Sequence, residues 1–330
     1  MRSFFILIVV LSCLSPIKAN DFKGAGATFP TLLFQKMFAQ YKKETGHTIT
    51  YEAIGSGDGL RALTAGEVDF AVSDIQECCG SSFSDAFIQI PVTIGAVAIV
   101  YQLPGNPALK LSPSVISDIF QGKIESWNHT RIQEENPGIV LPNIPIRVVL
   151  RGDRSGTTSL LSAYLTRASN SWAKDIGGAS TLLLKDARYV SGNMGMVTTV
   201  KSEEGSIGYA EWHYAMAYDV NVAAVRNFSG TYIQPSLTAI EASFKTKEDP
   251  EETDVYAYPI TGYSYIVVHR DQKNMGDIKR ARALVNLIWW MTHEGQIYAD
   301  SLGFPPLSPE SMSESTRRIR GLHFDDILLH

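Results

Sequence analysis

The chain has 330 residues, of which 45% are hydrophobic and 19% charged, with 26 glycines and 15 prolines. This length exceeds what one ordinary hydrophobic core organises and suits two lobes. The composition excludes a disordered chain, a collagen and a repeat array. The formal net charge of −5 excludes nucleic acid as the main partner, because such a partner needs a basic field. A small anion stays possible, since helix dipoles and one or two cations can bind it.

The first nineteen residues have the pattern of a secretory signal peptide. A positive charge at Arg2, the apolar run 4–11 and a break at Pro16 precede the small residue Ala19. The run is shorter than the ~20 apolar residues that a membrane-spanning helix needs. We therefore expect residues 1–19 to be removed, and the mature protein to be periplasmic or extracellular.

The cysteines and the glycosylation sequons decide little on their own. Lipidation of Cys13 is an alternative to ordinary export, although it requires very early cleavage. Cys78 and Cys79 are adjacent. Neighbouring cysteines rarely pair because the ring that they close is strained, so two free thiols are expected. Asn128 and Asn227 begin triplets that accept glycans if the source is a eukaryote.

Strands alternate with helices along the mature chain. Apolar residues at helical spacing follow Pro30, and the Val/Ile/Ala run 88–101 is expected to pass from one lobe to the other. The remaining strands are expected at 48–54, 68–72, 143–150, 206–209 and 260–269, and the remaining helices at 60–65, 114–120, 156–167, 192–200 and 280–298. The polar segment after Pro309 is expected to be a peripheral tail. This order predicts α/β lobes with mainly parallel sheets.

Three clusters of glycine and hydroxyl residues each join a strand end to a helix start. They are Gly24-Ala25-Gly26-Ala27-Thr28-Phe29-Pro30, Gly55-Ser56-Gly57-Asp58-Gly59 and Arg151-Gly152-Asp153-Arg154-Ser155-Gly156-Thr157-Thr158. Thr28 is expected to cap the helix that follows Pro30. A helix N-terminus offers N–H donors and partial positive charge, so it attracts anions. None of the three is a P-loop or a dinucleotide fingerprint. Together they are best explained by a site for a small multivalent oxyanion.

The clusters also resemble the signature segments of a known family, the phosphate-binding subunit of bacterial ABC phosphate importers (PstS-like solute-binding proteins). The similarity runs in order from about Asp21 to about Leu307. The segments that carry it are Gly24–Pro30, Ile54–Gly57, Val68–Asp74, Ile116–Trp127, Arg151–Thr157, Gly205–Glu211 and Tyr258–Thr261. The resemblance implies a type II periplasmic-binding-protein fold, in which two α/β lobes are joined by a two-strand hinge.

The resemblance further implies a division of the chain and a ligand set. Lobe one would comprise residues 20–96 and 262–330, and lobe two residues 97–261. Inorganic phosphate would be bound by Thr28 and Phe29 through their backbone N–H groups, and by Ser56, Asp74, Arg151, Ser155, Gly156 and Thr157. Asp153 would orient Arg151 without touching the ion.

Asp74 is the residue that would distinguish phosphate from other oxyanions. A carboxylate beside a dianion is repelled unless the ligand still carries a proton that it can donate. Hydrogen phosphate can donate this hydrogen bond and sulfate cannot, so sulfate would leave a buried acceptor unpaired. The alternative is that Asp74 merely caps the next helix. Two departures from the family pattern are Arg154, a cation at the cleft rim or a solvated side chain, and Asp58, whose charge weakens the second cluster as an anion site.

Other functions remain open from the residues alone. A phosphatase would use Ser155 or Thr157 as nucleophile, but it needs a base or a metal beside it. No two of the seven histidines have the spacing of a metal site, so neither a metal nor a cofactor is expected. A binder of sulfate or molybdate is the third possibility. A phosphate-binding protein would dock on a membrane ABC importer in a bacterium, or scavenge phosphate in a eukaryote, and we expect it to be a monomer.

Overall fold

The computed structural model describes residues 21–76, 85–248 and 254–329. The predicted signal peptide with Cys13 and the pair Cys78 and Cys79 lie outside these ranges. Among the described helices, none combines the length and the hydropathy of a membrane span.

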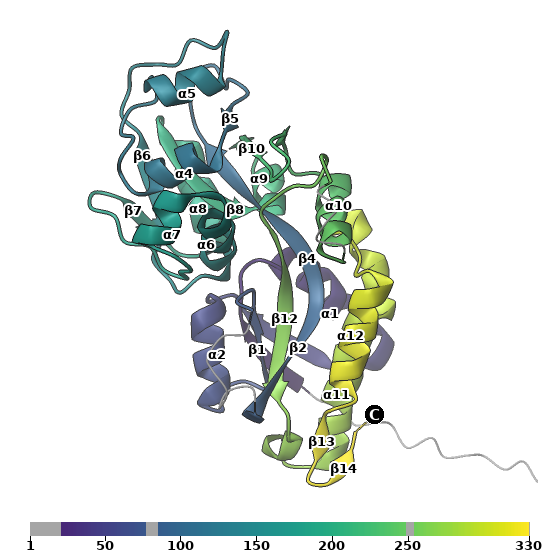
Figure 1. The fold of residues 1–330 in the computed structure, drawn as a ribbon. Coiled ribbons are helices and arrows are strands. Elements are labelled where there is room, and N and C mark those ends of the chain that lie inside the picture. Colours follow the sequence, from purple (N-terminus) through teal and green to yellow (C-terminus); the bar gives the residue numbers. More distant parts are fainter. Residues whose placement is uncertain (1–20, 77–84, 249–253, 330) are drawn as a thin grey trace, which may run out of the picture.

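Two bodies make up the molecule, joined by the long strands β4 (Phe87–Tyr101) and β12 (Thr261–His269) (Figure 1). We call the lower body lobe one and the upper body lobe two. Each has its own hydrophobic core. The core of lobe one includes Phe22, Phe70 and Leu284, and the core of lobe two includes Trp127, Leu150 and Trp172.

Lobe one is built on strands in the order β2-β1-β3-β12-β4. The first three strands are parallel to one another, and β12 runs antiparallel to both of its neighbours. The other elements of lobe one are β1 (Asp21–Gly26), α1 (Thr31–Thr45), β2 (Thr48–Glu52), α2 (Ser56–Thr64), β3 (Phe70–Ser73), α11 (Ile278–Thr292), α12 (Pro309–Ile319), the hairpin β13 (His323–Phe324) and β14 (Ile327–Leu328), and 3-10 turns at Gln272–Met275, Glu294–Tyr298 and Asp300–Leu302.

Lobe two continues the same sheet in the order β4-β8-β6-β7, with β9 also paired to β4. Strands β6, β7 and β8 are parallel, and β4 is antiparallel to β8. The elements of lobe two are β5 (Lys110–Leu111), α4 (Pro113–Phe120), α5 (Thr130–Glu135), β6 (Arg147–Arg151), α6 (Gly156–Ala168), α7 (Asn170–Asp175), β7 (Arg188–Val190), α8 (Gly192–Ser202), β8 (Ser206–Glu211), α9 (Trp212–Ala217), β9 (Asn221–Val222), β10 (Ala224–Arg226), β11 (Tyr232–Ile233) and α10 (Leu237–Glu248).

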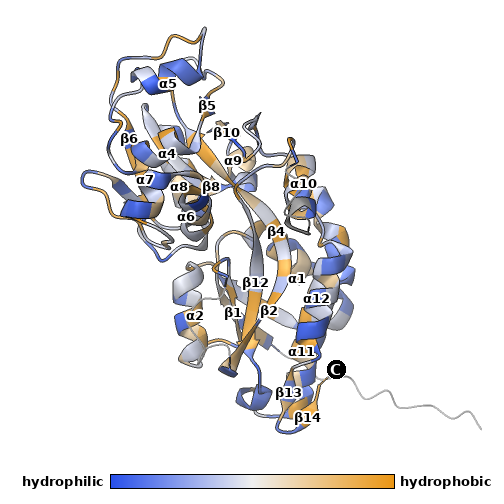
Figure 2. Ribbon diagram, viewed as in Figure 1, coloured by the Kyte–Doolittle hydropathy of each residue, from blue (hydrophilic) through white to orange (hydrophobic). Residues whose placement is uncertain are grey.

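The strand β4 confirms the predicted passage from one lobe to the other. Its first part pairs with β12 up to Ala96, and from Val97 onward it pairs with β8. Almost every residue of β4 is buried, which explains the continuous apolar run, and Figure 2 shows hydrophobic residues along the strand. Gly95 is required at the crossing, because a Cβ there would lie 2.6 Å from the ring of Phe29.

Two predicted helices have different bounds in the structure. Helix α2 starts at Ser56, four residues before the predicted segment 60–65, because Gly55 rather than Gly59 ends the preceding turn. The predicted helix 280–298 ends as α11 at Thr292, and a 3-10 turn follows. A Cβ on Gly295 in this turn would lie 2.8 Å from the ring of Trp290, so the chain packs its backbone against the indole.

The prediction of a peripheral tail after Pro309 is wrong. This segment forms α12, whose buried face consists of Ser311, Ser315 and Ile319. Ser315 Oγ donates a hydrogen bond to the main-chain oxygen of Pro91 on β4, at 2.8 Å. The polar composition was misleading because two of the three buried residues are serines, and Ser315 bonds the helix to the strand.

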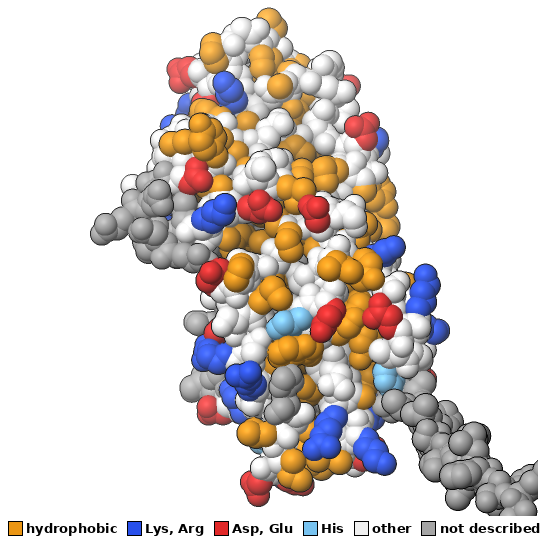
Figure 3. Space-filling view, turned by 90° about the vertical axis from the view of Figure 1, so that its right-hand side faces the viewer, with side chains coloured by type: hydrophobic (Ala, Val, Ile, Leu, Met, Phe, Trp, Pro, Cys, Tyr) orange, Lys and Arg blue, Asp and Glu red, His pale blue; other side chains and the backbone are white. Residues whose placement is uncertain are grey.

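Charged side chains of both signs are dispersed over one face of the molecule, among hydrophobic ones (Figure 3). Figure 3 shows Lys and Arg side chains interspersed with Asp and Glu on the side that lies at the right of Figure 1. On α12, Glu314 pairs with Arg317 and Arg318 at 2.6 and 2.5 Å. These ion pairs are partly exposed, so the helix is held chiefly by its buried face.

We predict that Ile319→Ala lowers the free energy of unfolding by about 2–4 kcal/mol, because removing a fully buried side chain leaves a cavity. Ser313→Ala on the exposed side of the same helix is the matched control, with an expected change within about 0.5 kcal/mol. Denaturation by urea measures both. Equal effects of the two substitutions would show that α12 does not belong to the core.

Candidate functional site

The second and third clusters meet where the two lobes touch. Gly156 is the first residue of α6 in lobe two, and it packs against Asp74 and Ser56 of lobe one. A Cβ on Gly156 would lie 2.5 Å from the Asp74 Cβ and 2.6 Å from the Ser56 Oγ. A glycine is therefore needed at this contact, which brings three of the predicted ligands together.

Ser56 begins α2, and its side chain points back toward β3. Its Oγ accepts a hydrogen bond of 3.2 Å from the backbone N–H of Asp74. The preceding Gly55 has φ of 100°, a conformation that side chains rarely adopt, and a Cβ there would lie 2.5 Å from Asp153 Oδ2. In the first turn of α2, Gly57 N–H donates to the main-chain oxygen of Arg154 at 3.0 Å. The second cluster thus touches the third at Gly55, Ser56 and Gly57.

Arg151 ends strand β6, and its guanidinium is only 1% exposed. Its Nε and Nη2 donate to the two carboxylate oxygens of Asp153 at 2.7 and 2.5 Å. This is the arrangement expected of a residue that orients the arginine. Arg151 Nη1 donates to Thr157 Oγ1 at 3.4 Å, which turns the remaining edge of the guanidinium toward the start of α6.

Ser155 caps helix α6. Its Oγ accepts a hydrogen bond of 3.2 Å from the backbone N–H of Thr158, and Ser155, Gly156 and Thr157 are all buried. Thr158 Oγ1 is in turn 2.7 Å from the hydroxyl of Tyr209 on β8, which fixes the first turn of the helix. A helix of 13 residues directs the positive end of its dipole at this point.

Asp74 follows β3 directly and is 2% exposed. Ser264 Oγ on β12 donates to its Oδ1 at 2.5 Å. Burial raises the pKa of Asp74 to about 7, and the nearby charge of Glu211 adds to this rise, although Ser264 and Arg151 act to lower it. Near neutral pH this carboxyl group can therefore either accept a proton in a hydrogen bond or donate one.

The first cluster differs from its prediction in one respect. Thr28 does not cap α1; Pro30 occupies that position without a side-chain cap. Instead, Thr28 Oγ1 accepts hydrogen bonds from the side chain and the backbone of Asn193 in lobe two, at 2.9 and 3.3 Å. The main-chain oxygen of Thr28 accepts one from the hydroxyl of Tyr214 at 3.1 Å. Phe29 is fully buried against β4.

Besides Tyr214, sequence reasoning missed other residues that contact the predicted set or each other. Asn193 bonds Thr28, Ser264 bonds Asp74, and Glu211 forms a buried pair with His213, whose Nδ1 lies 2.5 Å from Glu211 Oε1. One signal was available. Asn193 follows Ser191-Gly192 at a predicted helix start, which is the same pattern as in the three clusters.

The two departures from the family pattern have structural explanations. Arg154 lies exposed at the rim with its Nε 3.4 Å from Ser180 Oγ, and its side chain covers Gly57, where a Cβ would lie 2.5 Å from it. Asp58 is half exposed and faces Arg61, at 3.5 Å. Its charge is therefore directed along the outer surface of α2, away from Ser56.

The two sequons differ in their availability. Asn227 is buried, and its Nδ2 donates to the main-chain oxygens of Val255 and Ala257 at 3.0 and 3.2 Å. A glycan on this nitrogen would break these contacts. Asn128 is exposed, so its geometry permits modification.

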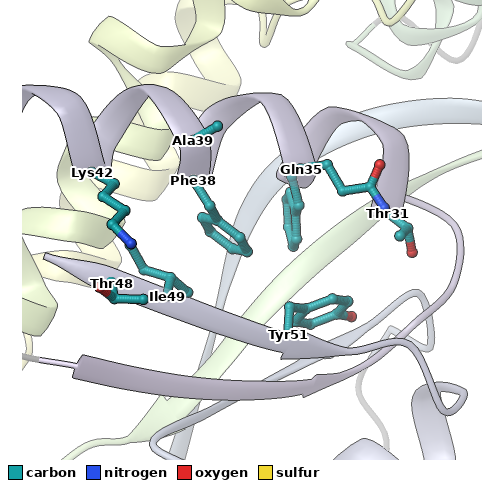
Figure 4. A pocket seen from close by; sticks show the side chains of 9 residues that line it. Thr31, Gln35, Phe38, Ala39, Lys42, Thr48, Ile49 and Tyr51 are labelled. Atoms are coloured by element: carbon teal, nitrogen blue, oxygen red, sulfur yellow. The ribbon is translucent and has the colours of Figure 1, made fainter.

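Two cavities border this region. One, of about 300 Å³, lies between α6 and β12, and Asp74 is among the residues that line it. The other, also of about 300 Å³, lies between α1 and β2 and is lined by none of the predicted ligands (Figure 4). Tyr51 at its floor donates to the main-chain oxygen of Ala27 at 2.7 Å and so supports the first cluster from behind. In the described ranges, no group of His, Cys, Asp and Glu could hold a metal ion.

Comparison with known proteins agrees with this architecture. The family model described as a PBP superfamily domain matches residues 15–294. The structure is similar to a high-affinity periplasmic phosphate-binding protein bound with phosphate (PfluDING), with a TM-score of 0.72 at 20% identity over 91% of this chain and 93% of that one. It is also similar to the phosphate-binding protein of Stenotrophomonas maltophilia, with a TM-score of 0.66 at 21% identity over 92% and 94% of the two chains.

Closer relatives exist in sequence. Phosphate-binding protein PstS of Haemophilus influenzae is 32% identical over 94% of this chain and 96% of its own length. PstS of Methanocaldococcus jannaschii is 33% identical over 83% and 79% of the two chains. The chain therefore belongs to the PBP superfamily and, within it, to the family of PstS phosphate-binding proteins. This confirms the family and the fold expected from the sequence.

The raised pKa of Asp74 gives a testable dependence of stability on pH. The folded state binds the Asp74 proton more tightly than the unfolded state does, so the resulting stabilisation is complete at low pH and is lost as the pH rises through about 7. Relative to Asp74→Asn, the free energy of unfolding should fall by roughly 3–4 kcal/mol between pH 4 and pH 8. Urea denaturation in phosphate-free buffer measures it. A difference that stays constant across this range would contradict the assignment.

Proposed function

We propose that this protein binds one inorganic phosphate ion between its two lobes and releases it unchanged. The observation that carries the proposal is the contact of the α6 start with the other lobe, where Gly156 packs against Asp74 and Ser56. Ser155, Thr157 and Arg151 lie at the same helix start. The names of the PstS relatives support phosphate as the anion.

The proposed ligands combine neutral donors with one compensated cation. Asp153 already balances the charge of Arg151, so the ion is held mainly by hydroxyl and backbone donors: Thr28, Phe29, Ser56, Ser155, Gly156 and Thr157. Asp74 faces this set as the acceptor that requires a proton on the ligand. Hydrogen phosphate brings that proton, and sulfate does not.

We further propose that the lobes, 20–96 with 262–330 and 97–261, open and close about β4 and β12. A ligand that touches both lobes stabilises the state in which they meet. The protein is proposed to be exported, because one of its structural relatives is a periplasmic protein. We also propose that it acts as a monomer. A membrane ABC importer is the partner that we propose if the source is a bacterium.

A phosphatase reaction is the weaker alternative, because the hydrogen-bond partners of both candidate nucleophiles are N–H donors, which cannot accept the hydroxyl proton. Ser155 Oγ accepts from the backbone of Thr158, and Thr157 Oγ1 accepts from Arg151. The curated relatives are named as binding proteins and not as enzymes. Release of phosphate from a phosphomonoester by the purified protein, abolished by Ser155→Ala, would reverse this preference.

Calorimetric titration with phosphate and with sulfate tests the proposed function. The unsubstituted protein should bind one phosphate and prefer it to sulfate, and Asp74→Asn should narrow this preference by roughly 10- to 100-fold, because the amide can donate to sulfate. The sulfate affinity of the unsubstituted protein should rise as the pH falls below about 7, where Asp74 is protonated. Equal affinity for both anions at pH 8 would overturn the role given to Asp74.

Gly156→Ala tests whether the contact between the lobes is part of binding. The added methyl group meets Asp74 and Ser56, so the phosphate affinity should fall by about 10- to 100-fold. Gly178→Ala is the matched control, because a Cβ there meets nothing within 4 Å. Unchanged affinity in Gly156→Ala would place the ion elsewhere.

A further inference from the structure

Asn193 lies at the start of α8 in lobe two and bridges the two lobes. It is fully buried. Its Nδ2 donates to Thr28 Oγ1 at 2.9 Å, and its backbone N–H donates to the same oxygen at 3.3 Å. The hydroxyl of one lobe thereby receives two hydrogen bonds from a single residue of the other.

The contact completes helix α8. Ser191 occupies the cap position of α8 but forms no side-chain cap hydrogen bond. Thr28 Oγ1 supplies the missing acceptor to the backbone N–H of Asn193, in the first turn. Gly192 permits this approach, since a Cβ there would lie 3.2 Å from the Thr28 methyl group. Helix α8 is thus capped from across the cleft.

The orientation of the Asn193 amide is fixed on its other side. Its Oδ1 accepts a hydrogen bond of 2.9 Å from the backbone N–H of Glu211. Because the oxygen is taken by a donor, the amide nitrogen must point at Thr28. Glu211 is itself held, since it pairs with Val97 of the crossing strand β4 and its carboxylate receives the N–H and Nδ1 of His213.

His213 links the same network to lobe one a second time. Its ring stacks on Phe304 with 3.8 Å between centroids and 16° between planes. Asn193 and His213 thus contact lobe one at two points, and Glu211 is hydrogen-bonded to both of them. Of these groups, Asn193 is the one whose side chain donates a hydrogen bond to a proposed ligand residue, Thr28.

We propose that Asn193 is a positioning residue that latches Thr28 in the closed, phosphate-bound state. The inference rests on the proposed function, because Thr28 is a proposed phosphate ligand through its backbone. The Thr28 hydroxyl then accepts the two hydrogen bonds from Asn193, while the Thr28 N–H donates to the phosphate ion. Separation of the lobes breaks both hydrogen bonds, so the latch slows the release of phosphate without speeding its capture.

The test measures the phosphate association and dissociation rates of Asn193→Ala, Thr28→Val and the double variant by stopped-flow. Each single variant should raise koff by roughly 5- to 20-fold and change kon by less than about twofold. The double variant should equal Thr28→Val, since that substitution removes both hydrogen bonds and Asn193→Ala removes only the one from the side chain. Thr28→Ser keeps the hydroxyl and should restore the original koff.

Thr198→Val, on the exposed side of α8, is the control and should leave both rates unchanged. A merely structural role of Asn193 would instead lower the stability of the phosphate-free protein and lower kon. If Asn193→Ala does not fold, Thr28→Val tests the latch from the other lobe. Unchanged koff in Thr28→Val, or additive effects in the double variant, would overturn the latch alone. Failure of the unsubstituted protein to bind phosphate would overturn the proposed function and the latch with it.

Discussion

The balance of buried charge at the meeting of the two lobes is the constraint on which the rest of this site depends. A buried ion is tolerated only beside a partner that hydrogen-bonds to it. Arg151 has that partner in Asp153, and Glu211 has it in His213. Burial alone lowers the pKa of His213, but Glu211 outweighs it and the net shift is upward. With both pairs formed, these four side chains add little net charge, so neutral donors and the dipole of α6 would hold the proposed anion. An acidic protein can bind a small anion in this way.

The close contact of the lobes depends on positions without side chains. Gly156 lets α6 reach Asp74, and Gly57 bonds its backbone N–H to Arg154 in the other lobe. Gly95 lets Phe29 lie on the crossing strand. A Cβ at Gly156 or Gly57 would meet the other lobe, whereas a Cβ at Gly95 would meet Phe29 within lobe one. The glycines of the clusters therefore serve the contact between the lobes as well as the turns in which they lie.

Local pattern explains how much of this could be predicted from the sequence. Each of the three clusters joins a strand end to a helix start within a few residues. The residues that determine its geometry are therefore consecutive in the chain. The strand at 88–101 could be predicted equally well, because burial on both faces leaves a continuous apolar run. The family resemblance then supplied the ligand set, which neither periodicity nor composition could have given.

What escaped prediction depends on residues that are far apart in the chain. Asn193 and Thr28 are separated by 165 positions, and Ser264 and Asp74 by 190. The sequence predicts Thr28 as the cap of the helix that follows it, because only the nearest helix start is apparent from local pattern. In the structure, the Thr28 hydroxyl caps α8 of the other lobe instead. Helix α12 was misjudged because its buried face is partly made of serines, and the partner of Ser315 on β4 lies 224 positions away.

The proton of Asp74 bears on the choice of anion in the proposed site. Burial is the largest cause that raises the pKa of this carboxyl group, and the charge of Glu211 in lobe two adds to the rise. A proton is therefore favoured in the space between Asp74 and the proposed ligand. Hydrogen phosphate fills that requirement with its own proton, whereas a fully ionised anion needs Asp74 to take one from water. The free-energy cost of protonating Asp74 decreases as the pH falls. Selectivity between the two anions is thus proposed to follow from the burial of Asp74, because sulfate would leave this buried acceptor unpaired.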